Sequence, residues 1–262
     1  MTSSSQPLPT TQRRVQQNFQ RGFRKYNDNA YVQKHIAARL IDLFAQTTSL
    51  SSFQSVLEIG CGTGFLTQEL VQRLSVDHWT INDLVNESRV HIDPILNSSA
   101  WDFLPGAIET IQFPKKYDLI ASSSAIQWIA DTPALLKCLS DSLNPGGWLI
   151  LSSFGPEHFR ELQTFDTKPC LMSYIVCDDW RTMLSNDFDQ IHIDQEMQVA
   201  KFGSVRNLLM HLRNTGVNAN AQHQWSRQRL AAFELEYTRR FSDRDQNVCL
   251  TYAPVYIIAQ KQ

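Results

Sequence analysis

Between positions 56 and 153 the hydrophobic residues fall into short continuous runs, separated by stretches with helical spacing. Two such stretches, 66–74 and 132–143, place apolar side chains on one face of a helix. Strands that alternate with helices in this way favour a parallel sheet with helices on both of its faces. The pattern therefore predicts an α/β fold. The runs expected to form buried strands are 56–60, 79–83, 99–104, 117–122 and 148–153.

The regular alternation is lost in the last third of the chain. Residues 155–185 are expected to be helical or irregular, and the alternating pattern of 188–202 is typical of an edge strand. Residues 204–240 predict two helices separated by a loop over 215–224. A last apolar run, 250–260, predicts a final strand. We therefore expect one domain that carries a helical insertion late in the chain.

Composition and charge exclude several classes of protein. The chain has 262 residues, 42% of them hydrophobic, with a net charge of −2, which is typical of a globular protein. No apolar stretch approaches the ~20 residues of a membrane helix. Residues 1–12 have no apolar segment of the kind found in secretory signals and are expected to be a disordered tail. The five cysteines form no CxxC motif, which favours reduced, buried thiols in a cytoplasmic protein, and the histidine spacing predicts no metal site.

The most informative stretch is 56–66, VLEIGCGTGFL, in which an apolar strand leads into three glycines at alternate positions and then into a helix. Glycines let the backbone turn sharply and let a ligand approach the peptide groups closely. A dinucleotide site would need a glycine at position 65, where Phe65 stands. The stretch therefore predicts a ligand-binding loop of another type.

This glycine spacing after an acidic residue resembles motif I of the class I S-adenosylmethionine-dependent methyltransferases. The resemblance implies a Rossmann-like, doubly wound, mostly parallel seven-stranded sheet, with S-adenosylmethionine as the methyl donor. Glu58 would lie near the amino acid part of the cofactor, and Asp83, at the end of the second strand, would accept the ribose hydroxyls. The Asn144-Pro145-Gly146-Gly147 turn is another family mark, and it is expected to end the preceding helix. The candidate cofactor-binding residues are Glu58, Gly60, Cys61, Gly62, Gly64, Asp83, Leu84, Ala107, Ile108 and Ser122.

One position departs from the pattern of that superfamily. Its third loop often carries an acidic residue that meets the adenine amino group, and the resemblance places Ala107 at that position here. Adenine recognition is therefore expected to rest on backbone groups and on Ile108.

A closer resemblance extends over nearly the whole chain, to the malonyl-acyl carrier protein O-methyltransferases of biotin synthesis. The N-terminal segment 15–33 is similar to that family's lead helix and lid. Ala125-Ile126-Gln127-Trp128 matches its Val-Gln-Trp type of motif, and 212–217 resembles its late Leu-Lys-x-x-Gly-Ala segment, with Arg213 replacing the usual lysine. The Leu250-Thr251-Tyr252 sequence before the last apolar run is also shared.

This resemblance implies methylation of the free carboxylate of malonyl-acyl carrier protein, giving the malonyl methyl ester that primes pimeloyl synthesis. Tyr26, Gln127 and Arg213 are the candidates to hold that carboxylate, which needs no general base because it is already anionic at pH 7. The expected organisation is a single methyltransferase domain over 13–262. Its parts are an N-terminal helical lid (13–50), a cofactor-binding core (51–153), a substrate and lid region (154–249) and a final strand (250–262).

The distribution of basic residues bears on the partner. Residues 1–27 and 197–233 each contain five Lys or Arg residues and no Asp or Glu. If both segments lie over the cofactor pocket they form a positive rim that would steer an acidic partner, such as an acyl carrier protein. A pI of about 6.4 and basic runs no longer than two residues argue against nucleic acid.

Two other functions fit the same residues. One is a class I methyltransferase for a different small acid or a quinone. The other is a non-methylating organelle assembly factor of similar sequence, which would suit a transit peptide and is disfavoured by the short N-terminal tail.

Overall fold

The computed structural model describes residues 25–165, 174–217 and 226–262, together with Arg13, Gln16, Gln17 and Gln20. The expected tail over 1–12 lies outside the described residues, as does Cys170.

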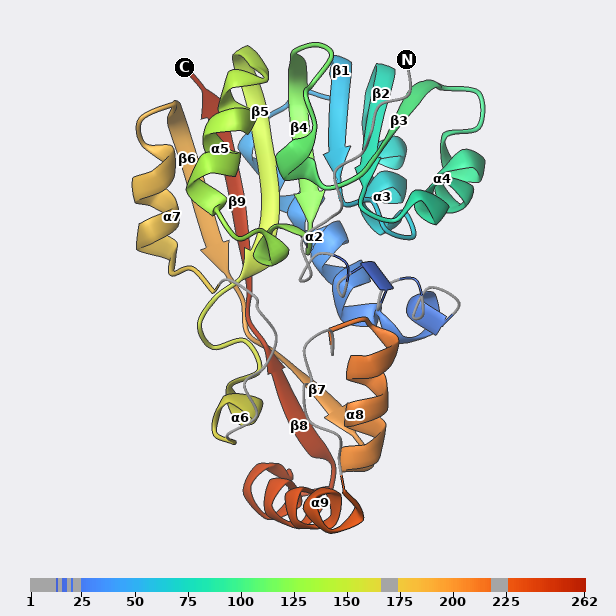
Figure 1. Ribbon diagram of the computed structural model, residues 1–262. Helices are drawn as coiled ribbons and strands as arrows, with labels where there is room; N and C mark the ends of the chain where they lie inside the picture. The colour runs from blue at the N-terminus through green and yellow to red at the C-terminus, as the bar shows by residue number, and fades with distance from the viewer. Residues whose placement is uncertain (1–12, 14–15, 18–19, 21–24, 166–173, 218–225) are drawn as a thin grey trace.

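The centre of the described structure is a seven-stranded sheet with the strand order β3-β2-β1-β4-β5-β9-β6 (Figure 1). Strands β1 to β5 pair in parallel, whereas β9 runs antiparallel to both of its neighbours, β5 and β6. The expected α/β fold with a mostly parallel seven-stranded sheet is thus confirmed. The strands are β1 (Ser52–Ile59), β2 (Ser75–Asp83), β3 (Ala100–Pro105), β4 (Tyr117–Ser123), β5 (Leu143–Phe154), β6 (Phe188–Gln195) and β9 (Pro254–Lys261).

Helices cover both faces of this sheet because its strands are apolar on both sides. In β5, Trp148 and Ile150 join one buried cluster, whereas Leu149 and Leu151 join the other. This is the alternation of period two that a strand imposes on its side chains. The first cluster also contains residues of α2 (Tyr31–Thr47), α3 (Phe65–Arg73) and α4 (Arg89–Leu96), and the second contains residues of α5 (Thr132–Asp141) and α7 (Cys177–Leu184).

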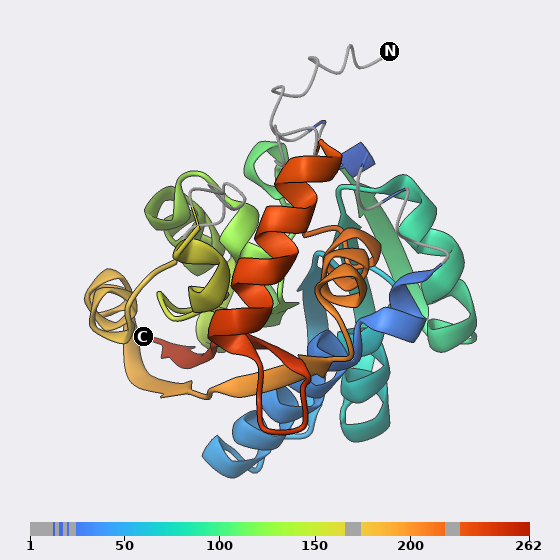
Figure 2. The same ribbon diagram turned by 90° about the horizontal axis from the view of Figure 1, so that it is seen from below.

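A smaller layer lies beyond the carboxyl ends of the parallel strands (Figures 1 and 2). It is built on a two-stranded sheet, in which β7 pairs with β8, and on helices whose apolar faces cover it. Tyr237 and Tyr252 are fully buried there. The chain passes directly from β8 through Ala253 into β9, so the smaller layer is joined to the main sheet. Its elements are β7 (Gln198–Phe202), β8 (Val248–Tyr252), α6 (Arg160–Gln163), α8 (Val205–Asn214) and α9 (Arg227–Phe241).

Several expected boundaries were wrong, because backbone pairing extends beyond the apolar runs. Strand β2 begins at Ser75, which pairs with Ser52, although the first residues of both strands are polar and exposed. Helix α5 ends at Asp141, since Leu143 already pairs with Tyr117 in the sheet, so the Asn-Pro-Gly-Gly segment belongs to β5.

Other expectations about the late part of the chain were corrected in the same way. The run 188–202 is two strands in two different sheets, and 250–260 is divided at Ala253. Of the described cysteines, all free, Cys61 is buried but Cys138 is exposed. The expectation of buried thiols was therefore wrong for Cys138.

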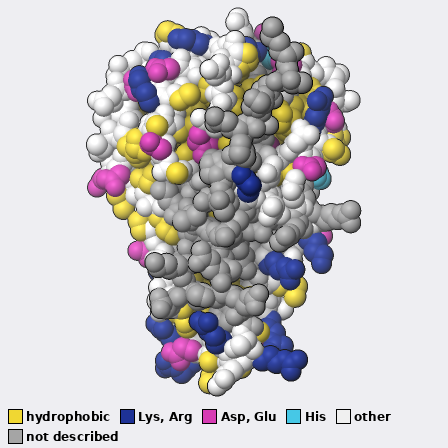
Figure 3. Space-filling model, in the orientation of Figure 1, with side chains coloured by type: hydrophobic (Ala, Val, Ile, Leu, Met, Phe, Trp, Pro, Cys, Tyr) yellow, Lys and Arg dark blue, Asp and Glu magenta, His cyan; other side chains and the backbone are white. Residues whose placement is uncertain are grey.

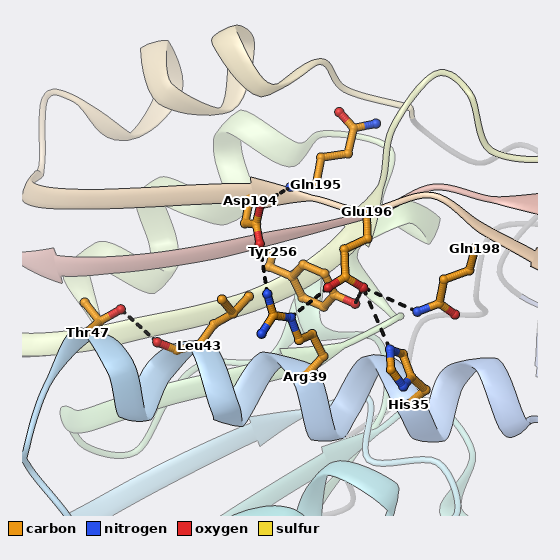
Figure 4. Close-up of polar contacts among 9 residues, drawn as sticks. All are labelled: His35, Arg39, Leu43, Thr47, Asp194, Gln195, Glu196, Gln198 and Tyr256. Atoms are coloured by element: carbon orange, nitrogen blue, oxygen red, sulfur yellow. Dashed lines mark hydrogen bonds and ion pairs between the residues drawn. The ribbon is translucent and has the colours of Figure 1, made fainter.

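A group of polar side chains attaches α2 to the edge of the sheet formed late in the chain (Figure 4). The guanidinium of Arg39 donates to Glu196 Oε1 at 2.7 Å and to Asp194 Oδ2 at 3.4 Å. The hydroxyl of Tyr256 donates to Glu196 Oε2 at 3.2 Å. These contacts hold α2 against strands β6 and β9. The position of α2 matters because its first turns form part of the cavity described next.

Candidate active site

A cavity opens where the parallel strands β1, β2, β3 and β4 end, the place at which open α/β sheets bind ligands. Its walls come from the four loops that follow these strands, from α2 and from Tyr26. The loops contribute 60–63, 82–85, 106–109, 123–126, 128 and 129, and the first turn of α3 contributes 65 and 66.

The glycine loop after β1 is held by backbone hydrogen bonds to the end of β2. The amides of Gly60 and Cys61 both donate to the carbonyl of Asn82, at 2.9 and 3.1 Å. Gly62 has a φ of +54°, and no atom lies within 4 Å of the position that a Cβ would take there. The backbone at Gly62 is therefore open on that side, which fits close approach by a ligand and is consistent with the cofactor predicted from the sequence.

Asp83, the last residue of β2, fixes this loop through its carboxylate. Its Oδ2 accepts from the amide of Gly62 at 2.7 Å and its Oδ1 accepts from the amide of Val85 at 2.7 Å. Burial raises the pKa of Asp83, and these amide hydrogen bonds act in the opposite direction by stabilising the charged form. A carboxylate has about four acceptor positions, so Asp83 can accept further hydrogen bonds from ligand hydroxyls in the cavity.

Glu58 lies behind the glycine loop, in β1, and is almost completely buried. Burial raises its pKa to about 8, with a smaller contribution from the negative charge of Asp83. Thr67 lies close enough to favour the charged form, but neither carboxylate oxygen makes a hydrogen bond of good geometry among the described residues. A buried acid of this kind is poised to ionise when a cation binds nearby.

We predict that Glu58→Gln removes a pH dependence from the free protein. The pKa of the native carboxyl, about 8, lies above its value of 4.5 in the unfolded chain, so the native state holds an extra proton between these values. This contribution to stability is complete below about pH 4.5 and is lost as the pH rises through 8. Thermal unfolding across that window should therefore show the variant gaining stability relative to the wild type as the pH increases.

Cofactor binding supplies the matching test. The cationic amino acid part of S-adenosylmethionine would favour ionised Glu58, so calorimetry in buffers of different ionisation enthalpy should detect proton release on binding to the wild type. Glu58→Gln should bind more weakly and release fewer protons. Comparing the two proteins cancels the titration of the ligand itself. Equal proton release in both would contradict the role predicted for Glu58.

Tyr26 forms one wall of the cavity. It is half-buried, and its ring stacks on Phe65 with 6.0 Å between centroids. Burial, and then the charge of Asp83, raise the pKa of Tyr26, which keeps the phenol neutral and able to donate a hydrogen bond.

A smaller cavity adjoins the first and lies toward the β7–β8 layer. The two cavities share the residues Tyr26, Gln33, Ser124 and Trp128. The remaining walls of the smaller one are Gln127, Phe154, His158, Thr215, Val217 and Tyr252, so none of its described lining residues is Asp, Glu, Lys or Arg. The described lining of this cavity is thus polar in part but uncharged.

The hydrogen bonds around the smaller cavity define its donors. The side-chain amide of Gln127 donates from Nε2 to the carbonyl of Ser124 at 2.7 Å. Burial lowers the pKa of His158 well below its ordinary value, so the ring is neutral. Its Nδ1 accepts from the amide of Ala253 at 3.4 Å, which leaves the proton on Nε2. The hydroxyl of Tyr252 lies 2.6 Å from Nε2 of His211, which burial also keeps neutral.

The cofactor-binding residues predicted from the sequence divide into two groups. Seven of the ten cofactor candidates line the larger cavity, whereas Glu58, Gly64 and Ser122 lie behind its wall. Gly64 precedes α3 as its N-cap, and the hydroxyl of Ser122 donates to the carbonyl of Ile59 at 2.9 Å. The seven that line the cavity are Gly60, Cys61, Gly62, Asp83, Leu84, Ala107 and Ile108.

The three acceptor-site candidates are not all close together. Tyr26 lines both cavities and Gln127 lines the smaller one. Arg213 is exposed near the end of α8 and is not among the described residues lining either cavity.

Sequence reasoning gave no individual role to several residues of the cavity walls, among them Asn82, Gln33 and Ser124. Asn82 donates from its amide to the carbonyls of Leu104 and Gly106, at 2.8 and 3.0 Å, and so supports the loop after β3. A buried amide next to Asp83 in an apolar strand was a signal that could have found it. Gln33 and Ser124 line both cavities; Gln33 is the last residue of the segment 15–33 that resembles the family's lead helix and lid, whereas no local pattern points to Ser124.

In the described ranges, no three His, Cys, Asp or Glu side chains are placed to hold a metal ion. No described helix is both long and apolar enough to cross a membrane.

Comparison with known proteins places these features in context. Residues 29–225 match a protein family described as Methyltransferase domain. The chain is 36% identical over 239 residues to a malonyl-(acyl-carrier protein) O-methyltransferase of Porphyromonas gingivalis, covering 90% of each chain. It is also 36% identical over 251 residues to a protein of the same name from Acinetobacter baylyi, covering 94% of this chain and 96% of that one.

A solved structure supports the fold. The N-methyltransferase NodS from Bradyrhizobium japonicum, in complex with S-adenosyl-L-homocysteine, is similar with a TM-score of 0.55 at 13% identity. The match covers 95% of this chain and 98% of NodS. At this identity the likeness shows a shared fold.

Proposed function

The chain belongs to the malonyl-(acyl-carrier protein) O-methyltransferase family, and on that premise we propose that it methylates the free carboxylate of a malonyl group held by an acyl carrier protein. S-adenosylmethionine is the methyl donor, and the product is the malonyl methyl ester that primes pimeloyl synthesis. The observation that supports this most directly is the pair of adjoining cavities. One has a glycine loop and an acidic strand end, and the other is uncharged and suited to a small acceptor group.

When bound, S-adenosylmethionine supplies a methyl group on a positively charged sulfur. The chain itself has to bind the reacting groups, align them and exclude water from them. We propose that Asp83 and the loop 60–63 hold the cofactor, with Glu58 near its amino acid part and Ile108 beside the adenine. Holding two reactants in line can supply ~7–11 kcal/mol of rate enhancement. A carboxylate needs no general base, and burial lowers the pKa of His158, which makes that ring a weak proton acceptor.

The uncharged cavity suits this reaction for an electrostatic reason. A negative carboxylate and a positive sulfur neutralise each other in the transition state, and exclusion of water helps such a step. Neutral donors such as Tyr26 and Gln127 can orient a carboxylate without forming an ion pair that would stabilise the starting state. The segments 13–50 and 154–249 would close over the acceptor as lid and substrate region.

The experiment that tests this function is transfer of radiolabelled methyl groups from S-adenosylmethionine to malonyl-acyl carrier protein, with acetyl-acyl carrier protein as the control. We expect label on the malonyl form alone, released by mild base as an ester should be. Absence of label, with cofactor binding intact by calorimetry, would reject the proposed acceptor but not the methyltransferase.

We also propose that the carrier is acidic and docks against α8 and α9, in the cytoplasm. Figure 3 shows Lys and Arg side chains at the end of the molecule that these helices form. Two cations of the basic segment 197–233 are already balanced, because Lys201 pairs with Asp243 at 2.8 Å and Arg206 pairs with Glu234 at 2.6 Å. Arg227 and Arg229 are exposed and have no salt bridge among the described residues, so they are the better candidates.

Charge reversal in this region should weaken docking without changing the chemistry. The double variant Arg227→Glu/Arg229→Glu is expected to raise the KM for malonyl-acyl carrier protein about tenfold or more at low salt, with kcat nearly unchanged. Its KM for a small malonyl thioester, such as that of N-acetylcysteamine, should stay the same.

The matched control for docking is Lys115→Glu/Lys116→Glu, which makes the same charge change in the exposed loop before β4, away from the cavities. It should leave both KM values near those of the wild type. If the two double variants respond equally, the effect is that of net charge, and docking on α9 is excluded.

A further inference from the structure

Ser124 stands where the two cavities meet, and its backbone is strained. It follows β4 directly and lines both cavities. Its φ is +56°, in the left-handed region that side chains other than glycine rarely adopt. A strained residue at a cavity wall is held by its surroundings, and such strain is often retained for function.

The surroundings of Ser124 hold its backbone from both sides. The amide donates to the hydroxyl of Ser152 at 3.0 Å, and to the carbonyl of Ser152 at 3.2 Å. The carbonyl of Ser124 accepts a hydrogen bond from the side-chain amide of Gln127, with 2.7 Å between Nε2 and the oxygen. Both the amide and the carbonyl of Ser124 are therefore hydrogen-bonded. These bonds hold the backbone in its strained conformation and so fix the direction of the Cα–Cβ bond.

The Ser124 hydroxyl has no hydrogen-bond partner in the part of the chain that the structure describes. Its Oγ atom is buried. Leaving a buried hydroxyl without a partner is unfavourable, so the group calls for an explanation. Ser123 and Ser152 differ in this respect, because their hydroxyls lie 3.0 Å apart and bond to each other, whereas the Ser153 hydroxyl is also buried without a described partner.

An acceptor carboxylate in the smaller cavity would be a suitable partner for this hydroxyl. An acceptor carboxylate there has no Lys or Arg to pair with among the described lining residues. The donors among those residues are neutral, and a hydroxyl that donates to a carboxylate forms one of the stronger hydrogen bonds. We propose that the Ser124 hydroxyl donates a hydrogen bond to the acceptor carboxylate at the boundary between the two cavities. This proposal rests on the proposed function and makes Ser124 a further substrate-contacting residue.

Two variants separate the hydroxyl from the backbone. Ser124→Ala removes the hydroxyl and keeps the strain, whereas Ser124→Gly removes both. In the presence of S-adenosylhomocysteine, the ratio of affinities for malonyl- and acetyl-acyl carrier protein reports the carboxylate alone. We expect both variants to lower that ratio about tenfold and to bind S-adenosylhomocysteine as the wild type does. Ser124→Gly should melt at or above the wild-type temperature, because its backbone strain is relieved.

The control variant is Gln246→Gly. Gln246 also has a positive φ, +65°, but lies exposed in the turn before β8. It should keep the wild-type affinity ratio. The proposal is overturned if either Ser124 variant retains the full preference for the malonyl form, or if both lose affinity for S-adenosylhomocysteine in parallel. A wild-type protein with no preference and no methyl transfer would instead reject the proposed function.

Discussion

Replacing Asp83 by alanine is expected to weaken the binding of S-adenosylmethionine by at least about a hundredfold. The carboxylate anchors the glycine loop through the amide of Gly62 at 2.7 Å, and it faces the cavity where it can accept ligand hydroxyls. Each hydrogen bond to a charged group contributes about 1.5–3 kcal/mol, and two such bonds correspond to a hundredfold or more. Calorimetric titration with S-adenosylmethionine measures the effect directly.

The isosteric variant Asp83→Asn refines this test. Its amide oxygen can still accept from Val85, but its NH2 group would face the amide hydrogen of Gly62, so donor would meet donor. We expect a loss close to that of the alanine variant. Asp77→Ala, at the exposed start of the same strand, is the matched control and should bind normally. Unchanged affinity in Asp83→Ala, with the fold intact by circular dichroism, would contradict the role assigned to this carboxylate.

The second large effect is expected at Gly60, where the glycine loop meets the loop after β4. Gly60 has a φ of +67°, and a Cβ there would lie 2.5 Å from the Cβ of Ala125. Gly60→Ala therefore combines backbone strain with a clash that displaces Ala125 and its neighbour Ser124. We expect a destabilisation of about 2–3 kcal/mol, and methyl transfer reduced about a hundredfold because misplacement near 1 Å has effects of this size.

A double-mutant cycle isolates the clash. Ala125→Gly removes the atom that the new Cβ would strike and leaves its Cα 4.0 Å away, an ordinary contact. The double variant should recover part of the stability and activity, with a coupling energy of about 1–3 kcal/mol by urea unfolding. Gly146→Ala has a similar φ, +74°, but its nearest atom is 4.0 Å away, so it measures strain without a clash. Additive effects of Gly60→Ala and Ala125→Gly would exclude direct contact between the two loops.

The sequence predicted the parallel core well because its signals are local. The apolar run into β1, the three glycines and the helix after them are contiguous, and this is where strand, loop and cavity wall were found. The prediction for the late part of the chain was less accurate. The run 188–202 reads as one strand, but β6 pairs with β9 and β7 pairs with β8. That division depends on pairing partners between 46 (Phe202 with Val248) and 73 (Phe188 with Lys261) residues away in the chain, which a local pattern does not contain.

The candidate site shows the same contrast. Asp83 could be selected because a carboxylate at a strand end has a known use, whereas Ser124 carries no pattern of its own. Its place in the site follows from a positive φ, from a hydrogen bond to Ser152 in another strand and from the two cavities that the residue lines. Arg213 illustrates the opposite case, since its motif suggested the acceptor site but α8 leaves it exposed.

By itself, then, the sequence determined the fold class, the glycine loop with its acidic partner strand, and the resemblance to a methyltransferase family. Each of these depends on residue types at fixed spacing along a continuous stretch, where backbone conformation follows from local sterics and burial. Only the tertiary structure decided that Glu58 is buried with a raised pKa, that two cavities adjoin, and that Ser124 stands between them. These properties arise from packing between residues distant in the chain, because burial and contact geometry are set by the assembled strands and loops together.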